Sequence, residues 1–292
     1  MEPAPRAACL GLDQGEPFRD AGGARCRPER QHHDLTAIVG QVAGDRLESA
    51  TKLAASSGLT YRTVATPTVT LAAWTRMSDP RQMVTIYIEG DGAAYGPDGQ
   101  PSLDPTPRHP LGLRLAMADP AANVIYLGRP CQYVRDPRCR TADWTTQRFA
   151  EPAVVAMGAA LDRLLPPNAK IELIGYSGGA AIAVQLAARR TDVVSLRTVA
   201  GNLDPQGVNR LHRATEFLVA PEPLAPPSRL VGLPQRHFVG RRDQVVPASI
   251  AEKFVLAMGP NACAAITMVN ANHEDGWEDA WRGLRAEVLP CG

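Results

Sequence analysis

The sequence lacks several features that would point to common classes of protein. Its charges balance, with 31 Lys and Arg against 30 Asp and Glu, so no long-range field favours a polyanion and nucleic acid is not an expected partner. No apolar run approaches the roughly 18 residues that a membrane-spanning helix needs; the stretch 180–188 is broken by Gln185. No Cys-x-x-Cys pair is present, and we therefore expect no structural metal site.

The chain nevertheless has six cysteines, an even number that suits an oxidising compartment. We expect two disulfides in the body of the chain, one joining Cys131 to Cys139 and one joining Cys263 to Cys291. The alternative is that these four residues are ordinary buried thiols.

Composition and length indicate one main globular domain. Apolar residues make up 45% of the 292 positions and charged residues 21%, values typical of a soluble domain able to bury a core. Residues 1–34 contain few large apolar side chains and are expected to form a disordered extension. A helical pattern over 35–57, ended by Gly58, predicts a helical lead-in within 35–60, and the main domain spans 61–292.

Within the main domain, segments rich in β-branched residues alternate with helical patterns. The predicted strands are 61–74, 83–89, 123–127, 170–175, 193–200, 236–240 and 265–270, and the predicted helices are 111–117, 151–165, 178–190, 250–258 and 277–288. Such alternation indicates an α/β fold with a mostly parallel sheet flanked by helices. The segment 202–235 has six prolines and is either a short lid or a surface loop.

One strand leads into a serine in a pattern that carries chemistry. Strand 170–175 ends in Gly175-Tyr-Ser-Gly-Gly179 and is followed by a helical segment. The Gly-x-Ser-x-Gly spacing fits a nucleophile elbow, in which glycines relieve crowding around a strained serine. Ser177 is therefore the candidate nucleophile, and the alternative is an ordinary strand-to-helix turn of small residues.

A serine nucleophile needs a base and an acid, which follow it in this architecture in the order acid, then His. His273 comes shortly after the last predicted strand, in a loop that precedes a helix, and is the candidate base. Asp243 follows the preceding strand and would orient the imidazole. Asp204 is the rival acid.

An oxyanion hole would complete the site. Its donors are the N-H of the residue after the nucleophile, Gly178, and an N-H from a loop after an early strand. The segment Glu89-Gly-Asp-Gly92 supplies that loop, and Asp91 is the expected donor, with Gly92 second. The Asp91 side chain would bind substrate, fix the loop or simply form a turn.

These residues together resemble the α/β-hydrolase superfamily over residues 61–292. The segments 87–92, 104–107, 129–133 and 199–204 are similar to a group of bacterial hydrolases, some of them described as lipoproteins. The resemblance implies the α/β-hydrolase fold and favours a periplasmic, envelope-attached or secreted protein over a cytoplasmic one. The segment 1–12 lacks the apolar region of a signal peptide, and Glu89 stands where His is common in the superfamily.

The sequence thus predicts a serine hydrolase that cleaves carboxylic esters, small or lipid, through an acyl-enzyme, without a cofactor. Thioesterase or peptidase activity on the same fold remains open because a triad does not specify its leaving group. A non-catalytic binding or envelope protein with this fold is the alternative from another class. The side chains considered for a substrate pocket, each with packing as the alternative, are Tyr95, Gln132, Tyr133, Trp144 and Tyr176.

Overall fold

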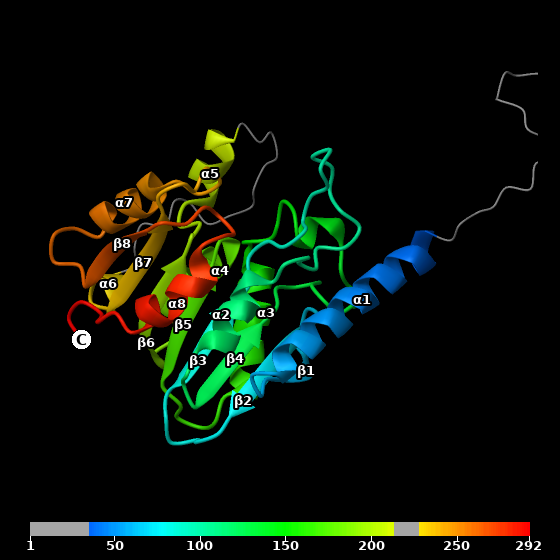
Figure 1. Ribbon diagram of the computed structural model, residues 1–292, viewed down its shortest axis with the longest axis horizontal. Coiled ribbons are helices and arrows are strands. Elements are labelled where there is room, and N and C mark those ends of the chain that lie inside the picture. The colour runs from blue at the N-terminus through cyan, green and yellow to red at the C-terminus, as the bar shows by residue number, and fades with distance from the viewer. Residues whose placement is uncertain (1–34, 213–227) are drawn as a thin grey trace, which may run out of the picture. The chain divides into compact units, whose positions relative to one another are not determined.

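A computed structural model describes residues 35–212 and 228–292, and residues 36–292 form one unit (Figure 1). The predicted extension 1–34 and the part of the predicted lid at 213–227 lie outside the described residues.

Eight strands form one sheet in the order β1-β2-β4-β3-β5-β6-β7-β8. The strands are β1 (Thr60–Ala65), β2 (Thr70–Met77), β3 (Val84–Ile88), β4 (Asn123–Leu127), β5 (Ile171–Tyr176), β6 (Val193–Val199), β7 (Gln235–Gly240) and β8 (Ala264–Val269). The β1-β2 and β2-β4 pairs are antiparallel and every other pair is parallel. The predicted mostly parallel α/β architecture is confirmed.

The helices are α1 (Leu35–Ala55), α2 (Leu111–Ala118), α3 (Glu151–Leu164), α4 (Gly178–Arg189), α5 (Pro205–Leu211), α6 (Ser228–Val231), α7 (Ala248–Ala257) and α8 (Trp277–Arg285), with a short 3-10 turn at Thr141–Asp143. Two of them, α5 and α6, lie in the segment for which only a lid or surface loop was expected. Asp204 caps α5 by accepting a hydrogen bond from the Gly207 N-H at 2.8 Å.

The single strand predicted over 61–74 is wrong, because the chain turns back there. Strands β1 and β2 form an antiparallel hairpin whose connection is closed by Thr66, with its N-H 3.1 Å from the Val69 carbonyl. Pro67 lies at this turn, and a proline has no N-H to contribute to a strand ladder. The β-branched residues on both sides hid the turn in the sequence.

Helices cover the sheet on both faces, and successive residues of a strand pack alternately against the helices of one face and of the other. Ile86 and Ile88 belong to the core shared with α3, α4, α6 and α7, whereas Tyr87 between them belongs to the core shared with α1, α2 and α8. Because successive side chains of a strand point to opposite faces, a strand covered on both sides is apolar at nearly every position. All five residues of β3 are buried.

Helix α8 is anchored firmly to the sheet, and this matters because the His273 loop leads into it. The Trp281 Nε1-H donates to the Tyr87 hydroxyl at 3.1 Å, and the Arg285 Nε-H donates to Asp119 at 2.8 Å. Arg285 also forms an ion pair with the buried Glu172 of β5 at 2.6 Å. The position of α8, and of the loop before it, is therefore tied to the sheet's interior.

His237 is a buried titratable group on the second strand from one edge of the sheet. It lies on β7 beside Thr198 of β6, with Nδ1 2.9 Å from the Thr198 hydroxyl and the ring against Phe254. Its Nε2 has no partner among the described residues. Burial lowers the pKa of His237 to about 3 from an ordinary value of 6.5, because charging the ring would require desolvating a cation.

We expect His237→Gln to flatten the acid dependence of stability. Between pH 6.5 and 3 the unfolded chain binds a proton that the folded chain excludes, so the free energy of unfolding falls as the pH falls, by up to about 1.4 kcal/mol per pH unit. Urea unfolding at pH 7 and pH 5 should show a smaller difference for the variant than for wild type. The exposed His109 provides the control His109→Gln. If the free energy of unfolding falls equally between pH 7 and pH 5 in all three proteins, His237 does not have the lowered pKa described above.

Candidate active site

The turn between β5 and α4 holds Ser177 in a strained backbone. Its φ is +48°, in the left-handed region that costs a non-glycine residue free energy and that recurs at functional sites. Gly175 and Gly179 make the turn sterically feasible. A Cβ on Gly175 would lie 2.5 Å from the Ala180 α-carbon, and one on Gly179 would lie 2.3 Å from the Ile88 carbonyl oxygen. These glycines stand at the positions that the elbow spacing requires.

Three side chains from separate loops meet at this turn. Ser177 Oγ lies 2.9 Å from His273 Nε2, and His273 Nδ1 lies 2.9 Å from Asp243 Oδ2. The second oxygen of Asp243 accepts the N-H groups of Val245 and Val246, both at 2.8 Å. The Asp243 side chain is fully buried, so the carboxylate is held in one orientation. The nucleophile, base and acid candidates thus lie within hydrogen-bond reach of one another.

The loop carrying His273 is braced on three sides. The Tyr176 hydroxyl donates to the His273 carbonyl at 3.2 Å, and its ring lies 5.7 Å from the imidazole. The Trp277 Nε1-H donates to the Asn272 carbonyl at 2.9 Å. The Arg242 N-H donates to the Ala271 carbonyl at 3.0 Å, which joins the His273 loop to the Asp243 loop.

Asp204, the rival acid, is engaged elsewhere. One of its oxygens caps α5 and the other lies 3.7 Å from Arg210. The imidazole of His273 contacts Asp243 instead.

The loop after β3 lies directly against the serine turn. A Cβ on Gly90 would lie 3.2 Å from the Ser177 Cβ, and one on Gly178 would lie 2.0 Å from Asp91 Oδ1. Asp91 itself is paired with Arg129 at 3.0 Å and with Arg148 at 2.9 Å. The two expected oxyanion donors, the N-H groups of Asp91 and Gly178, therefore belong to segments in direct contact.

Glu89 is a buried anchor behind this loop. Its Oε1 accepts from the Gly90 N-H at 3.0 Å, and its Oε2 accepts from the Tyr126 hydroxyl at 2.7 Å. Burial raises the pKa of the Glu89 carboxyl, and the hydrogen bonds that it accepts oppose this shift. The residue thus fixes the end of β3 relative to its neighbour β4.

The side chains considered for a substrate pocket take different places. Gln132 is buried, and its amide donates to the Gly90 carbonyl at 3.0 Å. Tyr176 braces His273 as described above. Tyr133 and Trp144 line a pocket of about 350 Å³ beside the Cys131–Cys139 disulfide. Tyr95 pairs with Pro101 in a short bridge, and Arg148 lies 5.9 Å over its ring.

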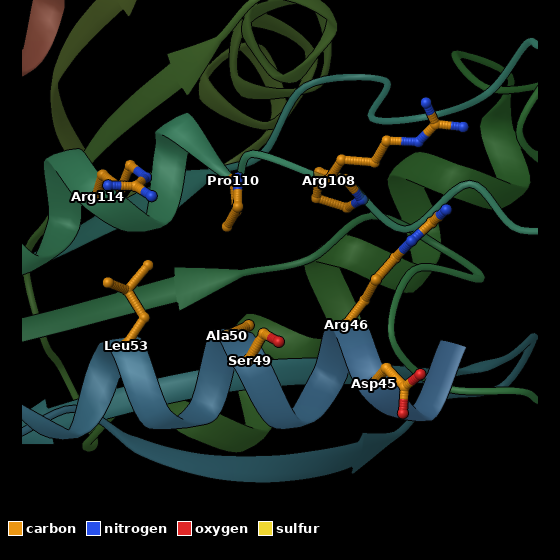
Figure 2. A pocket seen from close by; sticks show the side chains of 9 residues that line it. Asp45, Arg46, Ser49, Ala50, Leu53, Arg108, Pro110 and Arg114 are labelled. Carbon is orange, nitrogen blue, oxygen red and sulfur yellow. The ribbon is translucent and has the colours of Figure 1, made fainter. Parts of the chain in front are cut away.

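A second pocket, of about 430 Å³, lies between α1 and the segment leading into α2 (Figure 2). It is lined by Asp45, Arg46, Ser49, Ala50, Leu53, Pro107, Arg108, Pro110 and Arg114. None of these residues belongs to the Ser177, His273 and Asp243 group.

Comparison with known proteins shows which solved structures share this fold. No protein-family model and no curated protein sequence matches the chain. Among solved structures, a membrane phospholipase A reported as a bacterial virulence factor aligns with a TM-score of 0.57 at 16% identity, over 86% of this chain and 94% of that one. An esterase from Pyrococcus furiosus gives 0.55 at 13% identity, over 79% and 90%. An α/β-hydrolase candidate from Agrobacterium tumefaciens gives 0.50 at 17% identity, over 80% and 100%.

This chain has the α/β-hydrolase fold. The resemblance expected from its motifs is confirmed at that level. In the part of the chain that the structure describes, no cluster of His, Cys, Asp or Glu could hold a metal ion, and no helix is long and apolar enough to cross a bilayer.

The sequence predicted no role at the site for two arginines. Arg129 lies in the loop after β4, within the segment 129–133 that resembles other hydrolases, and Arg148 lies just before α3. A sequence does not distinguish a buried arginine from a surface one. Only the fold shows that Arg129 and Arg148 both reach Asp91.

The structure joins Cys131 to Cys139 and Cys263 to Cys291, the two pairs expected from the sequence. The first disulfide closes the short loop that carries Gln132 and Tyr133. The Tyr133 hydroxyl lies 3.0 Å from that of Tyr126, which contacts Glu89. The first disulfide thus lies close to the loop after β3, whereas the second ties the C-terminal segment to the start of β8.

Replacing each pair of cysteines by serine should show which disulfide supports the loop after β3 and which only stabilises the fold. We expect Cys131→Ser with Cys139→Ser to slow labelling of Ser177 by a fluorophosphonate about tenfold, because Gln132 would hold the Gly90 carbonyl less firmly. The matched variant, Cys263→Ser with Cys291→Ser, should lose about 2 to 4 kcal/mol of stability yet label at the wild-type rate. Labelling rates and thermal midpoints measure the two effects, and equal labelling by both variants would contradict the expectation.

Proposed function

We propose that this protein is a serine hydrolase that cleaves carboxylic esters through an acyl-enzyme. The observation that carries the proposal is the contact series from Ser177 Oγ to His273 Nε2 and from His273 Nδ1 to Asp243 Oδ2, each 2.9 Å, on a strained turn at the carboxyl edge of the sheet. Binding sites of open α/β sheets lie at this edge.

In the proposed reaction Ser177 Oγ forms a bond to the ester carbonyl carbon while His273 Nε2 takes the hydroxyl proton. The carbonyl π electrons move to oxygen, and the resulting oxyanion accepts hydrogen bonds from the N-H groups of Asp91 and Gly178. Collapse of this intermediate breaks the bond to the alcohol oxygen, which receives the proton from His273. Water then repeats the sequence on the acyl-enzyme and releases the acid and free Ser177.

Asp243 has an orienting and electrostatic role in this scheme. Its Oδ2 holds the proton of His273 on Nδ1, which leaves Nε2 free to accept from Ser177. The two backbone N-H groups on its Oδ1 stabilise the ionised carboxylate. The imidazolium that forms during attack is therefore paired with a prepositioned negative charge.

The comparisons with known proteins support an ester as the substrate class. The matched structures include a phospholipase A and an esterase, which favours a small-molecule or lipid ester. A thioester or a peptide has the same electrophilic carbonyl and differs in its leaving group, and these classes remain the alternatives that the assay below must separate.

We expect wild-type protein to hydrolyse p-nitrophenyl esters and Ser177→Ala to lose at least about a thousandfold in kcat. A series from acetate to palmitate gives the preferred acyl length and separates an esterase from a lipase. Activity that survives Ser177→Ala would show that another nucleophile acts. Inactivity on all esters with intact fluorophosphonate labelling would favour a thioester or peptide, and absence of labelling would favour a non-catalytic binding protein.

A pair of isosteric variants tests the acid. Asp243→Asn should lower kcat by roughly a thousandfold or more, because the amide would favour the wrong imidazole tautomer. Asp204→Asn is the matched control: asparagine is also a good helix N-cap, so kcat should stay within about twofold of wild type. Steady-state kinetics on the preferred ester measures both, and the reverse ranking would make Asp204 the acid.

A further inference from the structure

Asp91 is held by two arginines that come from separate loops. Its Oδ1 accepts from Arg129 Nη1 at 3.0 Å, and its Oδ2 accepts from Arg148 Nε at 2.9 Å. We refer to Arg129, Asp91 and Arg148 as the Arg-Asp-Arg triplet. Each carboxylate oxygen has its own guanidinium, so the side chain cannot rotate without losing an ion pair.

The two arginines are themselves fixed in the interior. Their side chains are 5% and 10% exposed. Arg129 Nη2 donates to the Arg148 carbonyl, and Arg148 Nη1 donates to the Thr145 carbonyl at 2.6 Å. Both guanidiniums lie over the Phe149 ring, at 5.2 Å and 4.9 Å from its centre. Burial lowers the pKa of Arg129, and the nearby charge of Asp91 opposes this shift.

The triplet touches both donors of the proposed oxyanion hole. One donor is the N-H of Asp91 itself. The other is the N-H of Gly178, whose α-carbon faces Asp91 Oδ1 so closely that a Cβ there would lie 2.0 Å from it. The spacing between the two donors is therefore set through the Asp91 side chain.

The charges of the triplet matter as much as its geometry. A bare carboxylate beside Gly178 would repel the negative charge that gathers on the substrate oxygen in the transition state. Two guanidiniums on that carboxylate offset its charge. Glu89, a second carboxylate near this loop, is engaged by Tyr126 and the Gly90 N-H. Removing one arginine would leave Asp91 incompletely neutralised next to the reacting centre.

We infer that Arg129 and Arg148 are positioning residues for the proposed reaction. Through Asp91 they set the separation of the two oxyanion donors and neutralise the carboxylate that lies beside them. The inference rests on the proposed function and deepens it, since it assigns residues that act only when negative charge develops on the substrate.

A double-mutant cycle on Asp91 and Arg148 tests the inference. We expect Arg148→Gln to lower kcat about 10- to 100-fold with KM within about threefold of wild type. Adding Asp91→Asn should restore kcat to within about tenfold of wild type, because an Asn-Gln hydrogen bond replaces the ion pair and no carboxylate is left beside Gly178. Arg189→Gln, which breaks an exposed pair with Glu151, is the control and should keep wild-type kcat and KM.

A merely structural role predicts a different pattern. In that case the double variant would be at least as impaired as Arg148→Gln, and kcat would follow the thermal midpoint measured for each protein; either result overturns the inference. If Arg148→Gln does not fold, the double variant decides alone, and a kcat more than about 100-fold below wild type overturns the inference. Hydrolysis that is absent in wild type, or that survives Ser177→Ala, overturns the proposed function and this inference together. Ser177-dependent hydrolysis with Arg148→Gln near wild type overturns only the inference.

Discussion

The close approach of the first turn of α4 to the end of β3 is the constraint on which the site depends. The backbone of Gly179 lies so near the Ile88 carbonyl that no side chain fits between them. This contact presses the serine turn against the loop that carries Asp91. A larger residue at position 179 would push the helix away from the strand and separate Ser177 from that loop, even with Ser177, His273 and Asp243 all still present.

Around this contact, each loop of the site is braced by groups that take no part in the proposed chemistry. Helix α8 is tied to the sheet through Trp281 and Arg285, which limits the movement of the loop carrying His273. Glu89 does the same for the loop after β3. A proposed reaction that needs hydrogen bonds of defined length gains from such bracing, because the donors need no rearrangement as charge develops.

The sequence predicted the sheet, most of its helices and the grouping of Ser177, His273 and Asp243, because these depend on local patterns and on the order of residues along the chain. It did not predict the β1-β2 hairpin, where β-branched residues continue through the turn. It also did not predict that Arg129 and Arg148 meet Asp91. Contacts of that kind depend on how loops far apart in the chain are placed by the fold, and a buried charge leaves no periodic pattern. The prediction of Asp243 over Asp204 rested on its place in the loop after the strand 236–240, and the structure adds the contact with His273.

The strained backbone of Ser177 also means that stability and the proposed activity make opposite demands on this residue. Glycine adopts positive φ without penalty, so a glycine at this position would relax the turn that the serine strains. The fold would then gain stability by losing the hydroxyl that the proposed reaction uses, which is the trade-off expected of a site under selection for activity. A selection for thermal stability alone would therefore favour replacing Ser177, and the variant it produced would lack the proposed nucleophile.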